Sequence, residues 1–156
     1  MHRFSNLRAL LAATTVFLST LGSGLILSAP ASAAGGLSVT PKTWDVIGIK
    51  SNNSGMADGP GSFPVGIKVC NTTGATLNNV ATQFVWDSSN SYISLDGSAN
   101  NSLGDLDPGQ CIDSYYIAQV QKDSAAWNTS RGYHILATAD GGATGSSPTP
   151  RQLYVE

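Results

Sequence analysis

Helical periodicity is nearly absent from this 156-residue sequence once its first residues are passed. Charge is scarce as well: charged side chains make up 12% of the chain, and Glu156 is the one Glu among ten acidic residues. Ser, Thr, Asn and Gly are abundant instead, and these residues favour strands and turns over helices. No basic patch of the kind that attracts nucleic acid is present, so we expect no nucleic-acid partner.

Familiar catalytic patterns are also missing. The sequence contains no Gly-x-Ser-x-Gly nucleophile elbow, no His-Glu-x-x-His zinc motif and no phosphate-binding loop. His134 has strand-like sequence on both sides, which predicts a half-exposed strand position rather than a catalytic base. We therefore predict a protein that is not an enzyme and has no cofactor, with catalysis by two scattered carboxylates as the open alternative.

The first 33 residues have the pattern of a secretory signal peptide. Arg3 and Arg8 precede an uncharged apolar stretch over residues 9–27, and Ala31-Ser32-Ala33 is a small-x-small cleavage signal. The alternative is an uncleaved membrane anchor, since about 19 weakly apolar residues nearly span a bilayer. We expect cleavage after Ala33, a secreted, periplasmic or cell-surface location, and contact with the membrane only through the signal peptide, which would be helical.

Residues 34–156 are predicted to form one all-β domain. Short alternations of apolar and polar residues recur between Gly/Asn/Ser/Asp clusters, which is typical of a β-sandwich or barrel. Residues 50–62 and 96–101 are predicted to be polar loops and residues 141–150 a flexible loop or linker. The last strand leaves open whether Glu156 ends the natural chain or more domains follow. The predicted strands cover residues 37–40, 43–49, 63–70, 79–86, 92–95, 102–106, 110–120, 131–139 and 152–155.

Two turn sequences resemble those of bacterial Ig-like repeat domains in surface proteins, namely the cell-adhesion-related and conserved-repeat domains of unknown function. The first runs from Cys70 through Asn71-Thr72-Thr73-Gly74 to Val80, with one residue more than the compact Asn-Thr-Gly form, and the second is Leu106-Asp107-Pro108-Gly109-Gln110. The resemblance covers residues 65–120. It implies an Ig-like antiparallel β-sandwich of about seven strands, an extracellular location, a stalk or adhesive role, and no catalytic residues.

Cys70 and Cys111 are the only cysteines. A pair of cysteines in an exported chain indicates a disulfide, the alternatives being two free thiols or a metal site. In an Ig-type sandwich the second and fifth strands are antiparallel neighbours, and these two cysteines end the one and begin the other.

If Cys70 lies opposite Cys111, the register of this strand pair follows, because the residue numbers of antiparallel partners have a constant sum. Lys68 then faces Asp113 as an opposite-charge pair, and the ring of Tyr115 can cover Gly66. With this register the pairs on the other face of the two strands are mainly apolar. They are Val69 with Ile112, Ile67 with Ser114, and Val65 with Tyr116.

The three tryptophans, Trp44, Trp86 and Trp127, admit two interpretations. Large aromatic side chains dominate sandwich cores, so packing in the core or at its rim is the prediction we favour. The alternative is a stacking platform for a sugar ring, which would make the chain a carbohydrate- or other ligand-binding module.

The acidic residues raise the question of a calcium site, which requires six to eight oxygen ligands. The sequence has no Asp-x-Asp-x-Asp-Gly run, so we predict no metal, although calcium stays open. Asn-x-Ser/Thr acceptor sequences for glycosylation occur at Asn52, Asn71, Asn100 and Asn128. The aspartates in question are Asp58, Asp96, Asp105, Asp107, Asp113 and Asp123.

Together these features predict an exported, non-catalytic structural or adhesive module of a bacterial cell-surface or secreted protein. Its expected partners are other domains of a longer surface protein or a surface glycan.

Overall fold

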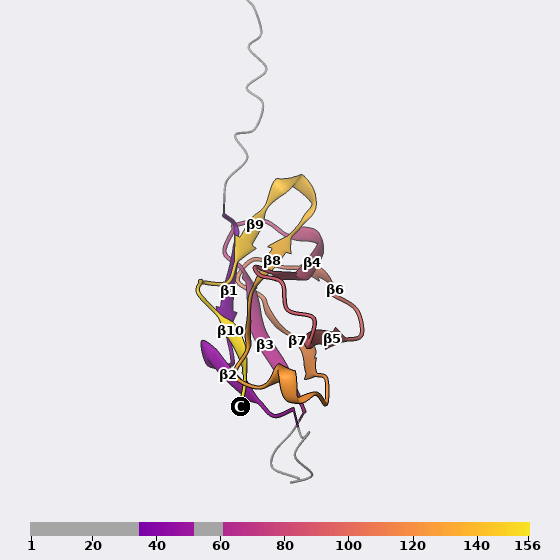
Figure 1. Ribbon diagram of the computed structural model, residues 1–156. Helices are drawn as coiled ribbons and strands as arrows, with labels where there is room; N and C mark the ends of the chain where they lie inside the picture. The colour runs from indigo at the N-terminus through magenta and orange to yellow at the C-terminus, as the bar shows by residue number, and fades with distance from the viewer. Residues whose placement is uncertain (1–34, 52–60) are drawn as a thin grey trace, which may run out of the picture.

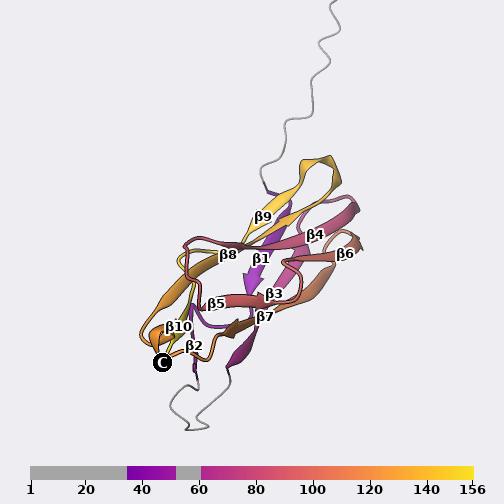
Figure 2. The same cartoon turned by 45° about the vertical axis from the view of Figure 1, so that its right-hand side comes forward.

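The computed structural model describes residues 35–51 and 61–156. These residues form two β-sheets that pack face to face, and most of the neighbouring strands are antiparallel. Figures 1 and 2 show the sheets from two directions. The predicted signal peptide and part of the predicted loop at 50–62 lie outside the described residues. No helix within the described residues is long and apolar enough to cross a lipid bilayer.

The first sheet has the strand order β1-β3-β7-β5 and the second has β2-β10-β8-β4-β6, with β9 paired to β8. Two short 3-10 turns, η1 (Ser124–Ala126) and η2 (Asp140–Gly142), precede β8 and β9. The strands are β1 (Leu37–Pro41), β2 (Val46–Ile49), β3 (Ser62–Asn71), β4 (Leu77–Trp86), β5 (Ile93–Asp96), β6 (Asn100–Leu106), β7 (Cys111–Val120), β8 (Ser130–Thr138), β9 (Thr144–Ser146) and β10 (Gln152–Val155).

Seven of these strands form an Ig-type framework. The order β1-β3-β7-β5 corresponds to the A-B-E-D sheet of Ig domains, and β10-β8-β4 corresponds to G-F-C. The remaining strands extend the second sheet: β2 and β6 lie at its two edges, and β9 continues along β8. The predicted Ig-like sandwich is therefore the fold of this chain.

The predicted register of β3 and β7 is confirmed over its full length. Cys70 is opposite Cys111, Lys68 opposite Asp113 and Gly66 opposite Tyr115. The Tyr115 ring also covers the glycine, because a Cβ built on Gly66 would lie 2.7 Å from Tyr115 Cε1. The two cysteines form a disulfide that joins positions 41 residues apart.

Lys68 and Asp113 face one another as an opposite-charge pair of the sheet, as predicted. Asp113 accepts its hydrogen bond from Lys42 Nζ, a residue that directly follows β1. This hydrogen bond raises the pKa of Lys42. The register of β3 and β7 did not indicate that a residue after β1 would also approach Asp113.

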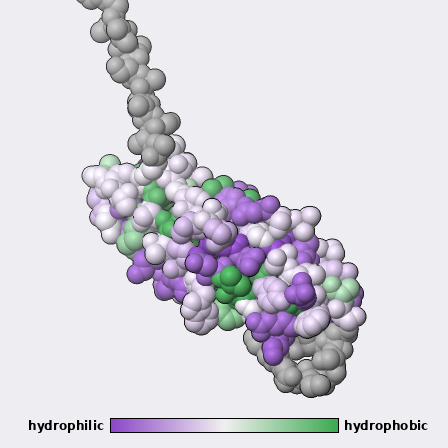
Figure 3. Space-filling view, turned by 60° about the vertical axis from the view of Figure 1, so that its left-hand side comes forward, coloured by the Kyte–Doolittle hydropathy of each residue, from purple (hydrophilic) through white to green (hydrophobic). Residues whose placement is uncertain are grey.

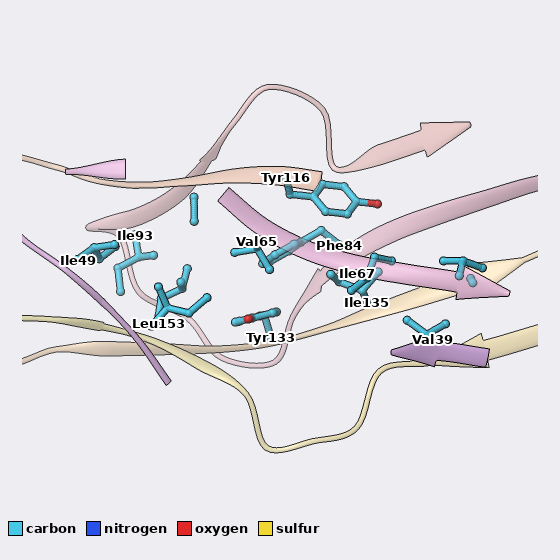
Figure 4. Close-up of a cluster of buried hydrophobic side chains, with 14 of the residues drawn as sticks. Val39, Ile49, Val65, Ile67, Phe84, Ile93, Tyr116, Tyr133, Ile135 and Leu153 are labelled. Atoms are coloured by element: carbon cyan, nitrogen blue, oxygen red, sulfur yellow. The ribbon is translucent and has the colours of Figure 1, made fainter. Parts of the chain in front are cut away.

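Alternating residues of both sheets fill a single core. Val65 and Ile67 of β3 meet Phe84 of β4 and Tyr133 of β8 between the sheets, as Figure 4 shows. The Phe84 and Tyr133 rings are stacked with their centroids 4.8 Å apart. Each of these four residues is at most 3% exposed, so both faces of the sandwich contribute to one desolvated layer.

Polar residues that interrupt the apolar faces pair with one another across the core. Thr82 of β4 and Ser114 of β7 are 2% and 4% exposed, and their hydroxyl oxygens lie 3.3 Å apart. The Tyr116 hydroxyl donates to Thr82 Oγ1 at 2.7 Å, and Asn101 Nδ2 donates to Ser114 Oγ at 3.0 Å. Burial raises the pKa of Tyr116. Each hydroxyl in this small network has a partner, which offsets the penalty for its burial.

The predicted loop over residues 141–150 is wrong in part. It contains β9, whose Gly145 pairs with Ala137 of β8 and lies so close to β1 that an added Cβ would be 2.2 Å from the Leu37 carbonyl oxygen. The loop also contains the cis bond between Thr149 and Pro150. Gly145 is required by the close approach of β9 to β1 and does not indicate a linker.

Removing the disulfide should strongly destabilise the sandwich. Replacing both Cys70 and Cys111 by Ala frees a loop of 41 residues in the unfolded chain, and we expect the free energy of unfolding to fall by about 4 kcal/mol. Denaturant unfolding of the oxidised parent and the double variant measures this difference. A loss below about 1 kcal/mol would contradict a structural role for the bond.

Two buried tyrosines should respond oppositely to loss of the hydroxyl. Tyr133 is fully buried and its hydroxyl has no hydrogen-bond partner, so Tyr133→Phe should leave stability unchanged or raise it. Tyr116→Phe removes the donor to Thr82 and should lower the free energy of unfolding by about 1 kcal/mol. Equal effects of the two substitutions in thermal or denaturant unfolding would count against this assignment.

Candidate functional site

An open groove of about 500 Å³ lies on the outer face of the second sheet. Gly132 and His134 of β8 form its floor. Asp87, which follows β4, forms one wall, and the segment that joins β9 to β10 forms the other. Apart from Gly132 and Pro150, the residues that line the groove have polar side chains, but most of the surface that they expose to the groove is apolar. Its lining residues are Asp87, Gly132, His134, Ser146, Thr149, Pro150, Arg151 and Gln152.

Strand pairing places the two titratable groups of the groove side by side. His134 points outward from β8 because its neighbours Tyr133 and Ile135 point into the core. It is paired with Val85 of β4, and Asp87 comes two residues later on the same face. The backbone N–H of Asp87 donates to the Gly132 carbonyl at 2.8 Å, which continues the pairing beyond the end of β4.

His134 Nδ1 is hydrogen-bonded to Asp87 Oδ1. The carboxylate accepts the Nδ1 proton, so Nε2 remains for another partner: it accepts in the neutral ring and donates in the protonated one. His134 is thus a half-exposed strand residue, as predicted. The groove combines one imidazole with one carboxylate, while the described lining residues include no second acid.

Arg151 connects the groove to the segment between β1 and β2. Its side chain is only 3% exposed, and Nη1 donates to Asp45 Oδ1 at 2.6 Å. Nη2 donates to the backbone carbonyls of Thr43 and Trp44 at 2.6 and 2.7 Å. A buried guanidinium requires such partners, so residues 43–45 are held against the start of β10.

The three tryptophans occupy different environments. Trp86 is half-buried against the core, with Arg131 Cζ 4.0 Å from its ring centroid, as the core-or-rim prediction requires. That prediction is wrong for Trp44 and Trp127, which are 75% and 66% exposed. Trp44 is not among the residues that line the groove; its backbone carbonyl accepts a hydrogen bond from the buried side chain of Arg151, which is one of them.

Trp127 lies at the other end of β10 from Trp44. The following residue, Asn128, donates its backbone N–H to the Val155 carbonyl at 2.9 Å. Four strand residues separate this point from Arg151, a span of about 13 Å at 3.3 Å per residue. The two exposed tryptophans therefore do not belong to one site.

The aspartates considered for calcium do not converge. Asp105 accepts from the Asn79 N–H at 2.9 Å and Asp107 from the Thr76 hydroxyl at 2.9 Å, while Asp113 accepts from Lys42. Asp96 ends β5 and Asp123 caps η1, and Asp58 lies outside the described residues. Among the described residues no group of three or more His, Cys, Asp or Glu side chains could hold a metal ion.

The four glycosylation sequences also fall into different environments. Asn71 is 1% exposed, and its Nδ2 donates to the carbonyls of Ala75 and Leu106, so it is a structural turn residue. Asn100 and Asn128 are exposed. Asn52 lies outside the described residues.

Sequence reasoning missed most of the groove. The strand predicted over residues 79–86 ends just before Asp87, and residues 141–150 are predicted to be a flexible loop or linker. One feature of the sequence could have pointed to Arg151, because it is an isolated Arg directly before a run of strand residues. Nothing in the sequence indicated that its partners lie at positions 43–45.

Comparison with known proteins gives likenesses of fold. No family model and no curated protein matches the chain. Among solved structures, a fragment of Escherichia coli alpha-2-macroglobulin from domain MG7 to the C-terminus is 10% identical, with a TM-score of 0.49 over 80% of this chain and 17% of that one. The CARDB domain of PF1109 from Pyrococcus furiosus is 14% identical, with a TM-score of 0.45 over 77% and 94% of the two chains. The same CARDB domain in complex with di-metal ions is 15% identical, with a TM-score of 0.43 over 77% and 87%.

Replacing Arg151 should loosen the segment that carries Trp44. Arg151→Lys cannot serve Asp45 and two carbonyls at once, and we expect the free energy of unfolding to fall by about 2 kcal/mol. Amide hydrogen exchange over residues 43–46 should become faster. Arg131→Lys, a change of the same kind on β8, is the control and should leave exchange at residues 43–46 unaltered.

Proposed function

We propose that this chain is an exported, non-catalytic Ig-like module that binds a saccharide in the groove beside His134. The observation that carries the proposal is an open groove lined by polar side chains, one of which, Arg151, also binds the backbone of Trp44, a tryptophan that is 75% exposed. A tryptophan combines a large apolar ring with a polar N–H, which suits it to contact a ligand at the protein surface.

The chemistry of the lining residues suits a polyhydroxylated ligand. A sugar hydroxyl both donates and accepts a hydrogen bond, and the groove offers both kinds of partner. Asp87 only accepts, the Gln152 amide and the hydroxyls of Ser146 and Thr149 do both, and His134 contributes one ring nitrogen. The exposed face of Trp44 supplies the flat apolar surface on which a sugar ring can stack.

Export and a role at the cell surface complete the proposal. The chain has a predicted signal peptide, and the Cys70–Cys111 disulfide is typical of proteins in oxidising compartments. The resemblance of its two turns to bacterial Ig-like repeats supports an adhesive module of a surface or secreted protein. Other domains of such a protein, or a surface glycan, would be its partners.

A pure spacer role is the second candidate. The continuous seven-strand framework and the disulfide favour mechanical stability. A spacer needs no exposed tryptophan, so the two candidates differ in whether Trp44 matters for binding.

The test is a glycan-array screen of the secreted protein followed by calorimetry on the best ligand. Trp44→Ala should weaken binding about tenfold, or ~1.4 kcal/mol, while Trp127→Ala, an equally exposed tryptophan at the other end of β10, should bind as the parent does. Asp87→Asn should also weaken binding, since the carboxylate both accepts from the ligand and orients His134.

Gly132→Ala adds one methyl group to the floor of the groove without disturbing the fold. An added Cβ meets Asp87 Cβ at 3.5 Å and Ser88 Oγ at 3.7 Å, which are ordinary contacts, so a loss of binding would reflect contact between the ligand and the groove floor. Absence of any glycan ligand, or equal effects of the two tryptophan substitutions, would favour the spacer role.

A further inference from the structure

Strand pairing places a row of residues across the second sheet that begins in the groove and ends outside it. Gly132 of β8 is paired with Gln152 of β10, and Gln152 is paired with Val46 of β2. Asp87 stands at the other end of the row, because its N–H donates to the Gly132 carbonyl at 2.8 Å. Neighbouring strands lie about 4.8 Å apart, so the row from Asp87 to Val46 is about 14 Å long.

This row lies on the outer face of the sheet. The residues that follow its members along β8, β10 and β2 are all buried in the core, and side chains alternate between the two faces of a strand. Val46 does not line the groove, whereas the other three members of the row do, yet Val46 is 51% exposed. A ligand that fills the groove and continues along the row therefore reaches Val46.

Two exposed apolar residues are held next to the start of β10. Val46 is paired with Gln152, and the Trp44 carbonyl accepts from Arg151; the two residues are 51% and 75% exposed. Figure 3 views the side on which Figure 1 shows β2 and β10, and a small hydrophobic area lies there among hydrophilic residues. Apolar surface with a few polar groups that fix orientation is the usual composition of a small-molecule site.

The charges along the row favour an uncharged ligand. A Cβ built on Gly48, the next outward residue of β2, would lie 2.6 Å from Glu156 Oε1, so this carboxylate lies on the outer face beside the end of the row. Asp87 supplies a carboxylate at the other end. Arg151, the Arg that lines the groove, is committed to Asp45 and to backbone carbonyls. Carboxylates accept hydrogen bonds from sugar hydroxyls but repel acidic sugars.

We propose that the groove and Val46 together bind a linear oligosaccharide of uncharged sugars, which runs across the strands from Asp87 to Val46. The inference rests on the saccharide-binding function proposed above and adds the length, direction and charge of the ligand. A single sugar ring does not span a row of about 14 Å, so the ligand has more than one ring. Val46 contacts only the part of the ligand that extends beyond the groove, and it therefore determines specificity for chain length.

Calorimetry of the secreted protein tests the proposal, with the best-binding glycan of the array screen and its acid-hydrolysis fragments, down to the monosaccharide, as probes. Affinity should rise about tenfold from the monosaccharide to the trisaccharide, because the longer probe adds contacts with Gln152 and Val46. Val46→Ala should lower the affinity for the trisaccharide about threefold and leave that for the monosaccharide unchanged. Ile117→Ala is the control: Ile117 is 38% exposed on β7 of the other sheet, and its variant should bind every fragment as the parent does.

Affinity that does not depend on chain length, a best ligand built of acidic sugars, or equal losses in the two variants overturns this inference and leaves saccharide binding in the groove intact. Absence of any glycan ligand overturns the proposed function and this inference together. If circular dichroism shows that Val46→Ala is unfolded, amide chemical shifts of the parent decide instead. Shifts at residues 46–48 that appear only with the longer fragments support the inference, and any other pattern contradicts it.

Discussion

The antiparallel pairing of β3 with β7 is the contact on which the rest of the sandwich depends. Its register is continuous from Ser62 opposite Gln119 to Cys70 opposite Cys111, where the disulfide closes it. β1 adds to one side of this pair and β5 to the other. Since side chains alternate along a strand, a slip of one residue would turn Val65, Ile67 and Val69 toward water and bring Lys68 into the core.

The second sheet packs on this pair through apolar contacts and through one polar link. Thr82 and Ser114 break the apolar pattern of β4 and β7, and each would be costly to bury alone. They lie opposite one another, and with Tyr116 and Asn101 they form a closed hydrogen-bonded group. An apolar contact tolerates small shifts between the sheets, whereas this group requires one particular alignment.

The groove lies where the chain leaves this regular framework. The segment after β9 crosses to β10, and residues 42–45 cross from β1 in one sheet to β2 in the other. Arg151 holds these two crossings together with bonds to Asp45, Thr43 and Trp44. The backbone of Trp44 and the groove with its His134–Asp87 pair lie at this junction. The exposed Trp127 and Tyr115 lie elsewhere on the framework.

Much of the architecture could be predicted from the sequence. Alternation of apolar residues along β3, β4, β7 and β8 predicted the strands, and the two cysteines predicted the register of β3 and β7. These features are local or depend on a single pairing. The sequence did not indicate contacts in which a side chain meets a partner from an unrelated part of the chain: Asp113, which faces Lys68 as predicted, also binds Lys42.

The sequence by itself determined an all-β, disulfide-bonded sandwich and the face to which each residue of the central strands points. Only the tertiary structure decided that Trp44 is exposed and that Ser146, Thr149, Pro150 and Arg151 line a groove instead of belonging to a linker. The reason is physical. Strand alternation and turn chemistry are properties of neighbouring residues, whereas Arg151 and Asp45 lie 106 positions apart and meet only after both sheets have formed.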